Sequence, residues 1–544
     1  MKSQTLVVRD NPITLEGSSM RSHALGRVIA GVTAAVVATA MLAACSSPEP
    51  GTGTKDIRFQ LFQAPTSFDP FHAEGAADGE IVGLHFRSLV ANESQEFVPS
   101  LASSWEFTPD AKSVTFTLAE TNWSDGKPFT SADVVYSLET WADPATESLH
   151  GGELAGVVGY DEFVAGDAPS VSGITALDES TVQIDLKEPS VVFLSNLLYL
   201  KVIPQHIYGE LDSADFAGSE EFRSPTVGIG PYIFSRWVDD DQIEFVPNPE
   251  SNEDHPLDHI YAQYLTGDVA RAQLQTGEID IAQLASADVE TVRQEDVVDV
   301  QVGPGIGVMS LYTALDNGKL ADARVRQAIL YAIDRQAIVD NVLNGNGSVP
   351  QSMLYTPEWA TPDDLTDYDF DPEKAKTLLA EAAWDASTVV YLDIIPGQPD
   401  RDAVMNVVQG QLAAVGIDAQ LRASQPAQLT ELVENREFDL LISIMGLVGS
   451  EPGNINRRFM CDASSNISGY CNPELDALLL EGVKTDDQSV REPIYQEANR
   501  ILNVDQPAMP LYVEQPAYGS AKRVTGFDPA VGTLNAAQHW NIAG

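Results

Sequence analysis

The sequence predicts an α/β protein with two or three domains. The first observation is that strands and helices alternate through its second half. In chain order, we expect a strand at 389–395, a helix at 401–415, a strand at 418–423, a helix at 428–435 and a strand at 438–444. Such alternation is typical of α/β domains. The second observation is length, since the 500 residues after residue 44 can bury more than one hydrophobic core.

The segment before residue 45 has the features of an export signal. Arg21 and Arg27 form a basic region, the apolar run 28–42 follows, and small residues precede Cys45. The run is shorter than the roughly twenty apolar residues that span a membrane. We therefore expect residues 1–44 to be a cleaved signal peptide.

Leu42-Ala43-Ala44-Cys45 resembles the lipobox of bacterial lipoproteins, in which the cysteine is diacylated and becomes the new N-terminus. The resemblance implies that Cys45 carries the lipid, that 45–54 is a flexible tether, and that the protein is held on the extracytoplasmic face of the cell membrane. An ordinary signal peptide followed by an unmodified cysteine is the alternative. Residues 1–19 include two acidic residues, which are unusual in a signal, so we expect translation to start at Met20.

The chain is strongly acidic, with 80 Asp and Glu against 31 Lys and Arg and a net charge of −49. This charge repels nucleic acid and anionic lipid surfaces, so we expect no nucleic-acid partner. Most of the acidic side chains are expected to form a solvated surface.

Two cysteines follow Cys45, and they flank a loop rich in Ser and Asn: Cys461 and Cys471. In an oxidising compartment such a pair favours a disulfide, and two free thiols are the alternative. No other cysteine or histidine lies nearby in the sequence, so we expect no metal site there.

Local signals place further elements in the first half of the chain. We expect strands at 57–62 and 114–118 and a helix at 80–89. Thr130 and Asp133 form a capping box that opens another helix.

Two longer helices are expected further on. One covers 322–344, with Asp322 as its N-cap and an apolar residue at every fourth position. Another begins at Asp371-Pro372, with proline at the first helical position. Gly228 and Gly230 fit a tight turn.

Seven segments spread over the chain carry a further signal: 123–138, 202–208, 227–232, 274–280, 322–335, 375–384 and 507–512. The most specific of them reads DARVRQAILYAIDR over 322–335. Together they resemble the signature blocks of family 5 extracellular solute-binding proteins, the peptide/nickel class that serves ABC importers. They occur in the order of that family.

The resemblance implies two lobes around a cleft, a periplasmic-binding-protein-like fold of the class II type. The first lobe is expected to comprise 55–99, 226–305 and a return at 513–544. An extra subdomain of that lobe is expected at 100–225, and the second lobe at 306–512.

The resemblance also implies a substrate-binding protein that captures short peptides or peptide-like solutes by hinge closure and delivers them to permease and ATPase subunits. We expect a monomer with no cofactor and no resident metal. We expect no enzymatic activity, since Gly-x-Ser-x-Gly, His-Glu-x-x-His and Walker A motifs are absent. The alternatives are a binding protein for a nickel chelate or a saccharide, and a receptor or scaffold that does not transport.

In peptide binders of this family, a carboxylate in the second lobe takes the α-amino group of the ligand. The family pattern is a strand, then Gly-Trp, then a loop that ends in Asp-Pro. Here Glu451 stands at the aspartate position, and Met445 replaces the tryptophan with a flexible apolar surface. A surface acid that binds no ligand is the alternative for Glu451. The expected ligand-binding residues are Ala76, Ala77 and Asp78 in the first lobe and Tyr312, Met445, Gly446, Leu447, Ser450, Glu451 and Asn454 in the second.

Overall fold

The computed structural model of the chain describes residues 54–73, 75–94, 96–239, 241–305, 307–446, 451–463 and 465–543. The chain divides into two units, 1–53 and 54–544, and the elements below all belong to the second. The predicted signal peptide, Cys45 and the tether up to residue 53 lie outside the described residues, as do Leu447 and Ser450.

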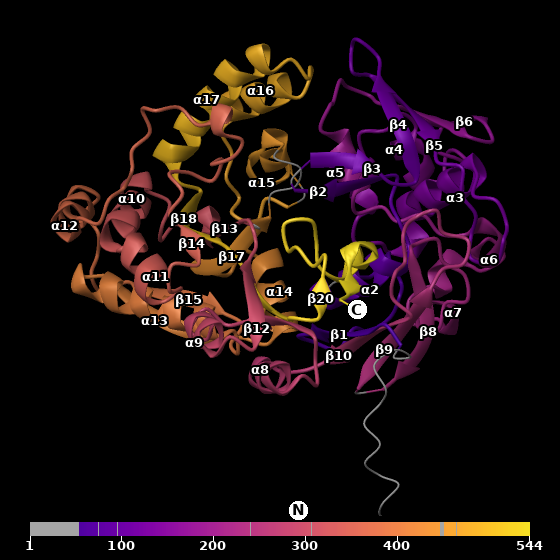
Figure 1. Cartoon of the computed structure of the whole chain (residues 1–544). Helices are drawn as coiled ribbons and strands as arrows, with labels where there is room; N and C mark the ends of the chain where they lie inside the picture. Colours follow the sequence, from indigo (N-terminus) through magenta and orange to yellow (C-terminus); the bar gives the residue numbers. More distant parts are fainter. Residues whose placement is uncertain are drawn as a thin grey trace, which may run out of the picture. The chain divides into compact units, whose positions relative to one another are not determined.

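A seven-stranded sheet joins the start, the middle and the end of this unit (Figure 1). Its order is β12 (Val298–Val302), β19 (Ala517–Ala521), β11 (Ile281–Leu284), β1 (Asp56–Leu61), β10 (His259–Tyr264), β9 (Gln242–Pro247) and β8 (Tyr232–Val238). β1 is parallel to β10 and β11, and the other pairs are antiparallel. Helices α2 (Ala76–His85), α8 (Gly267–Thr276) and α9 (Val289–Glu295) pack against it.

A four-stranded antiparallel sheet is inserted after the first strands. Its order is β4 (Ala102–Phe107), β5 (Ser113–Leu118), β7 (Thr181–Asp185) and β6 (Ile174–Asp178). Helix α3 (Ser131–Ala142) packs against it, and its predicted capping box is confirmed, with the Thr130 N–H donating to the Asp133 carboxylate at 3.0 Å. Its core is continuous with one core of the seven-stranded sheet, and this cluster includes the fully buried Trp123 and Trp141. A separate core lies between β11, β12 and β19 and the helices α8 and α9.

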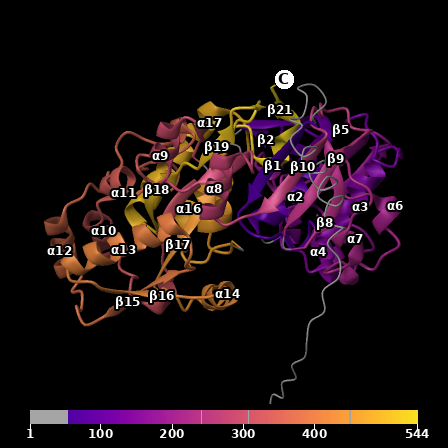
Figure 2. The ribbon, with the colours of Figure 1, turned by 60° about the horizontal axis from the view of Figure 1, so that its bottom comes forward.

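The six-stranded sheet has both faces covered. Its order is β14 (Gly347–Ser348), β18 (Ala508–Glu514), β13 (Gly307–Tyr312), β17 (Leu440–Gly446), β15 (Val389–Ile394) and β16 (Asp418–Ala423). Met309 and Leu311 of β13 belong to a core shared with α10 (Ala323–Ala332), α12 (Pro372–Glu381) and α13 (Pro399–Ala414). Figure 2 shows these three helices grouped together at its left. Val308 and Tyr312 belong to a second core with α16 (Pro473–Gly482) and α17 (Gln488–Asp505), because strand side chains alternate between faces.

Shorter elements complete the unit. They are β2 (Val90–Glu93), β3 (Glu96–Pro99), α4 (Tyr160–Val164), α5 (Phe193–Leu197), α6 (Gln205–Tyr208), α7 (Glu220–Arg223), α11 (Arg335–Asn341), α14 (Pro426–Glu434), α15 (Asn456–Phe459), β20 (Val524–Thr525) and β21 (Asn541–Ile542). Three-residue and longer 3₁₀ turns connect several of them, including η2 (Gly151–Leu154) and η6 (Pro452–Ile455).

The predicted single helix over 322–344 is wrong, because the chain forms two helices there. Helix α10 ends at Ala332, and Ile333 has extended backbone angles (φ −103°, ψ 119°). Asp334 then caps α11, since its carboxylate accepts a hydrogen bond from the Ala337 N–H at 2.9 Å. An aspartate side chain that bonds the backbone in this way competes with a continuous helix.

Two other local predictions need correction. The helix expected at 80–89 is α2, which begins at Ala76 because Gly75 and Asp78 form its N-terminal cap. Gly228 and Gly230 do not form a hydrogen-bonded tight turn, since Gly228 has no regular structure and Gly230 lies at a bend. The Gly230 N–H donates to the His85 carbonyl at 3.0 Å, at the end of α2. A Cβ atom at Gly230 would lie 1.9 Å from the Leu84 carbonyl oxygen, so close approach of the two backbones explains this glycine.

The chain passes between the seven-stranded and six-stranded sheets at two places. One crossing lies between β12 and β13, and the other between β18 and β19. The two crossings are side by side, because the Gly303 N–H donates to the Pro516 carbonyl at 2.8 Å. These paired connections form the only covalent links between the two sheets in the part of the chain that the structure describes.

Candidate functional site

The structure places Glu451 at the start of a 3₁₀ turn, where its carboxylate is already occupied. The carboxylate caps η6 by accepting a hydrogen bond from the Gly453 N–H at 2.8 Å. It also forms a short ion pair with Arg491 of α17. Both side chains are largely buried, with exposed fractions of 12% for Glu451 and 7% for Arg491.

Arg491 is itself held by the fold. Its Nε–H donates to the Gly482 carbonyl at 2.8 Å, and its guanidinium lies 5.2 Å from the ring centre of Tyr495 and 5.7 Å from that of Trp359. Burial lowers the pKa of Arg491, but the Glu451 carboxylate outweighs it and leaves the pKa above its usual value. Arg491 therefore stays charged under all ordinary conditions.

Tyr312 and Met445 belong to the same buried cluster, but they lie at opposite ends of the β13–β17 pair, since Tyr312 is opposite Leu441. β13 and β17 pair antiparallel, with Val308 opposite Met445 and Gly307 opposite Gly446. The Tyr312 and Met445 side chains are 2% and 4% exposed, so they form part of the packed core rather than an open wall. Gly446, at the end of β17, is exposed.

The Tyr312 hydroxyl is a buried polar group with no hydrogen-bond partner among the described residues. The Arg458 guanidinium lies 5.9 Å from the centre of its ring. Burial raises the pKa of Tyr312 to about 12, although Arg458 and Arg457 act in the opposite direction. Asn454 lies in the same turn as Pro452, and its backbone N–H donates to the Glu451 carbonyl at 3.1 Å.

The three residues predicted from the first lobe lie in the first turn of α2. Ala76 is exposed and Ala77 is fully buried. The buried Asp78 carboxylate accepts hydrogen bonds from the backbone N–H groups of Thr66, at 2.6 Å, and Gly75, at 3.2 Å. Asp78 therefore stabilises the start of α2, and these hydrogen bonds hold its carboxylate within the fold.

A contact that sequence reasoning missed joins the Glu451 turn to the four-stranded-sheet region. Arg457 of α15 donates to the Tyr199 hydroxyl at 3.0 Å and lies 3.5 Å from the Glu153 carboxylate of η2. His150 stacks on Tyr199, with ring centres 4.7 Å apart. Burial, together with Arg457 and Lys201, lowers the pKa of His150 to about 4, so this ring is neutral at pH 7.

Backbone contacts lie beside the Arg457 contact. The Val191 N–H donates to the Val483 carbonyl at 2.9 Å. A Cβ atom at Gly453 would lie 2.4 Å from the Val192 side chain, so a glycine is needed for this approach. The only sequence signal for this region was an Arg-Arg pair, six residues after Glu451, in a chain with few basic residues.

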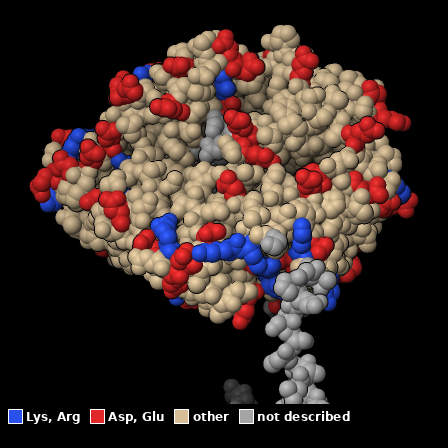
Figure 3. Space-filling view, in the orientation of Figure 1, with Lys and Arg blue, Asp and Glu red and all other residues tan. Residues whose placement is uncertain are grey.

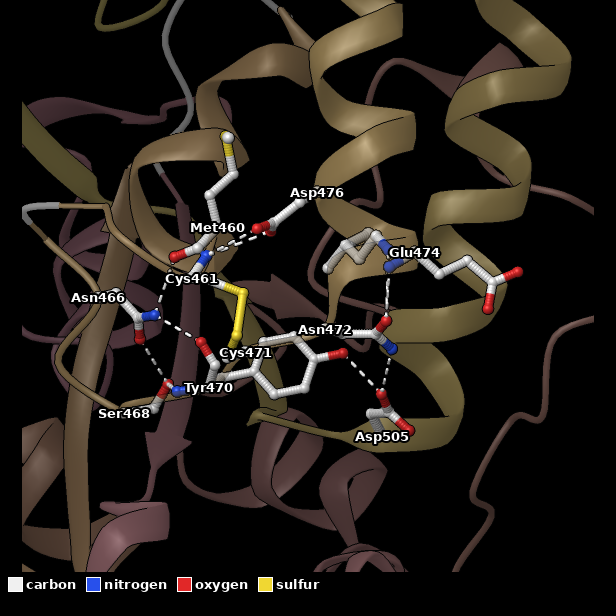
Figure 4. The surroundings of a disulfide bond; sticks show 11 residues. Met460, Cys461, Asn466, Ser468, Tyr470, Cys471, Asn472, Glu474, Asp476 and Asp505 are labelled. Carbon is white, nitrogen blue, oxygen red and sulfur yellow. Dashed lines mark hydrogen bonds between the residues drawn. A yellow bond between two sulfur atoms is a disulfide. The ribbon is translucent and has the colours of Figure 1, made fainter.

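The predicted disulfide is present, and it closes the loop that follows α15 (Figure 4). Asn466 spans this loop by donating to the carbonyls of Met460 and Tyr470, at 2.9 and 2.7 Å. The Cys461 N–H donates to the Asp476 carboxylate at 3.2 Å, which connects the loop to α16. The loop is therefore fixed by covalent and hydrogen bonds on both sides.

Other candidate sites receive less support. Two surface cavities have volumes of about 700 Å³ and about 290 Å³, and neither is lined by a predicted ligand-binding residue. Among the described residues, no group of three or more His, Cys, Asp or Glu side chains is arranged to hold a metal ion.

None of the described helices has the length and apolar content required to cross a membrane. Acidic side chains are scattered over the face seen in Figure 3, with fewer basic ones.

Two α/β lobes built on separate sheets and joined by paired crossings define a two-lobed binding protein of the periplasmic class. The oligopeptide-binding protein AppA from Bacillus subtilis, in complex with a nonapeptide, has the same fold. The TM-score is 0.78 at 22% identity, covering 91% of this chain and 100% of that one. The model of bacterial extracellular solute-binding proteins, family 5 (middle), matches residues 96–466, and the chain belongs to this family. Its members are extracytoplasmic substrate-binding proteins of ABC transporters and are not enzymes.

Relatives with assigned names extend the similarity to nearly the whole chain. A protein of Brucella ovis named as an ABC transporter peptide-binding protein is 28% identical over 507 residues, which cover 90% of this chain and 92% of that protein. The dipeptide-binding protein of Escherichia coli K12 is 27% identical over 524 residues, which cover 91% of this chain and 93% of that protein.

Proposed function

We propose that this protein is the lipid-anchored substrate-binding component of an ABC importer and that it captures short peptides or peptide-like solutes. Membership of the family and two relatives named for peptide or dipeptide binding support this function. The partners are a permease and an ATPase, and the protein itself is a monomer that catalyses no reaction. The lipobox-like sequence before Cys45 supports an anchor on the extracytoplasmic face of the membrane.

The proposal keeps the lobe boundaries expected from the sequence. In this proposal, 55–99, 226–305 and 513–544 form the first lobe, with 100–225 as its extra subdomain, and 306–512 form the second. The solute binds between the lobes, near the Glu451 turn, and the lobes close on it by bending at the two crossings. The observation that carries this proposal is the Arg457 contact, because it connects the turn at the expected ligand position with the opposite lobe. A ligand at that turn is thereby coupled to closure.

Native mass spectrometry of the exported protein tests the proposal. The protein is purified from a bacterial periplasm, and whatever is bound is released by denaturation and identified. A set of short peptide masses is the expected result. A single non-peptide mass, or a nickel adduct that chelation removes, would contradict the peptide assignment, since a nickel chelate or a saccharide would then be the solute.

The transport role needs a separate measurement. Uptake of a bound peptide by cells that carry the permease and ATPase should fall when this protein is deleted and return when it is restored. Unchanged uptake would instead favour a receptor or scaffold that does not transport.

A further inference from the structure

His150 lies at the contact between the two proposed lobes. Its ring stacks on Tyr199, with ring centres 4.7 Å apart, and the ring centre of Trp141 lies 6.3 Å away. Arg457, from α15 in the second lobe, donates to the Tyr199 hydroxyl at 3.0 Å, and its guanidinium lies 5.2 Å from the centre of the same ring. His150 and Arg457 therefore contact one tyrosine from opposite lobes.

Two cations act on the His150 ring. Arg457 is one, and the other is Lys201 of the first lobe, whose ammonium group donates to a hydroxyl and a carbonyl group at 2.9 and 3.0 Å. Burial and Arg87 lower the pKa of Lys201 to about 8, so Lys201 is largely charged at pH 7 and below. Burial, Arg457 and Lys201 lower the pKa of His150 from 6.5 to about 4. Because Arg457 belongs to the second lobe, a proton on His150 opposes contact between the lobes.

Two carboxylates come from elements that pack beside this contact. Glu153 of η2 lies 3.5 Å from Arg457, and burial raises the pKa of Glu153 although Arg457 lowers it. A carboxyl group whose pKa rises on closure takes up a proton when the lobes close, so Glu153 acts against His150. On α3, the Glu139 carboxylate accepts the Val171 N–H at 3.1 Å. Of these groups, His150 is therefore the one whose protonation favours separation of the lobes.

We propose that His150 is an acid sensor that opens the two lobes as the pH falls from about 7.5 to about 5.5, so that a bound solute is released more readily in acid. The inference rests on the proposed function, since it concerns the closure described there. It does not depend on which solute is bound.

The size of the effect follows from the two states of the ring. With a pKa of 6.5 in the open form and about 4 in the closed form, the ratio of open to closed molecules would rise about tenfold between these pH values. Part of the burial of His150 comes from the first lobe alone and remains when the lobes separate. We therefore expect a rise of about threefold to tenfold.

Spin labels on the two lobes measure this opening directly. Leu177→Cys in β6 and Leu480→Cys in α16 replace exposed side chains, which are 53% and 50% exposed. With the disulfide formed and Cys45 lipidated, no other thiol competes for the label. Pulsed electron paramagnetic resonance gives the distances between the labels in the exported protein, freed of bound solute, at pH 7.5 and 5.5. The ratio of long to short distances should rise about threefold or more in acid.

Four variants of the labelled protein identify the sensor. His150→Phe keeps an aromatic ring against Tyr199 but cannot titrate, so its ratio should be the same at both pH values; a purely structural role would change the ratio equally at both. His150→Gln gives the same test if the phenylalanine variant folds poorly. His255→Gln, at an exposed loop position, is the matched control and should keep the acid response. Glu153→Gln should also keep it, because His150 remains.

The outcomes separate this inference from the proposed function. If the open population stays constant or decreases in acid, or if its increase persists in both His150 variants, the inference is wrong and the peptide-binding function stands. Loss of the response in Glu153→Gln with retention in His150→Phe would assign the sensor to Glu153 and overturn the inference. A solute that proves not to be a peptide would contradict the proposed function and leave the acid response unaffected.

Discussion

Acid should destabilise this protein through one buried histidine, His85 at the end of α2. Its side chain is 1% exposed and packs edge-on against Phe68, with ring centres 5.4 Å apart. Its Nδ1 accepts the Phe234 N–H at 3.1 Å, so its Nε2–H donates to the Val227 carbonyl at 3.2 Å. The ring is thus held in its neutral form, and a proton on Nδ1 would replace an existing hydrogen bond with a clash.

The magnitude follows from the pKa. Burial lowers the pKa of His85 from 6.5 to about 3 in the folded protein. Below pH 6.5 the unfolded chain therefore binds a proton that the folded chain does not, and stability falls as the pH falls toward about 3. At about 1.4 kcal/mol per pH unit, the contribution of His85 between pH 7.5 and 5.0 is a loss of about 2 kcal/mol.

Urea unfolding at pH 7.5 and 5.0 measures this loss. His85→Gln removes the titrating group and keeps an amide that can bond the same neighbours, so its stability should drop about 2 kcal/mol less than that of the wild type between the two pH values. Any packing loss in the variant is the same at both pH values and cancels. His255→Gln, at an exposed loop position, should retain the wild-type drop. Equal drops in wild type and His85→Gln would refute the reasoning.

Three further variants test other contacts. Arg457→Gln removes the contact between the lobes and should weaken ligand binding about fivefold, the equivalent of about 1 kcal/mol for a partly exposed pair; calorimetry measures it. Replacing Cys461 and Cys471 with serine opens a loop whose ends are 10 residues apart and should cost about 3 kcal/mol in urea unfolding. Gly230→Ala places a methyl group against the Leu84 carbonyl and should cost about 2 kcal/mol by the same assay.

Each of these changes has a matched control. Arg436→Gln, at an exposed ion pair with Asp316, should leave binding unchanged. Wild-type protein treated with reductant should unfold at the same urea concentration as the double serine variant; a difference would mean that the serines themselves act. Gly79→Ala lies in α2, where a Cβ meets nothing within 4 Å, and it should not destabilise. Equal losses at Gly79 and Gly230 would contradict the close-approach explanation.

Local signals predicted several of the longer elements of the fold. The capping box at Thr130 and the Asp371-Pro372 helix start are confirmed, since the residues that define each boundary lie within a few positions of one another. The break at Asp334 was missed because its apolar stripe continues through two helices, and only the side-chain cap reveals the interruption.

The candidate site was less accessible to prediction, because its decisive contacts join distant residues. Glu451 could be nominated from a loop pattern, but its partner Arg491 is 40 positions away in another helix. The Arg457–Tyr199 contact spans 258 positions. Such pairs depend on how the elements pack, and no periodicity or spacing in one sequence encodes them.

The paired crossings at Gly303 and Pro516 restrict which movements the two lobes can make. A single strand of chain would let one lobe swivel around it, whereas two connections held together by a backbone hydrogen bond resist torsion and leave bending as the soft motion. The lobes would then open and close by bending about a single axis through the two crossings, and they would return to the same relative orientation each time. A permease that recognises both lobes at once would meet the same surface after every cycle.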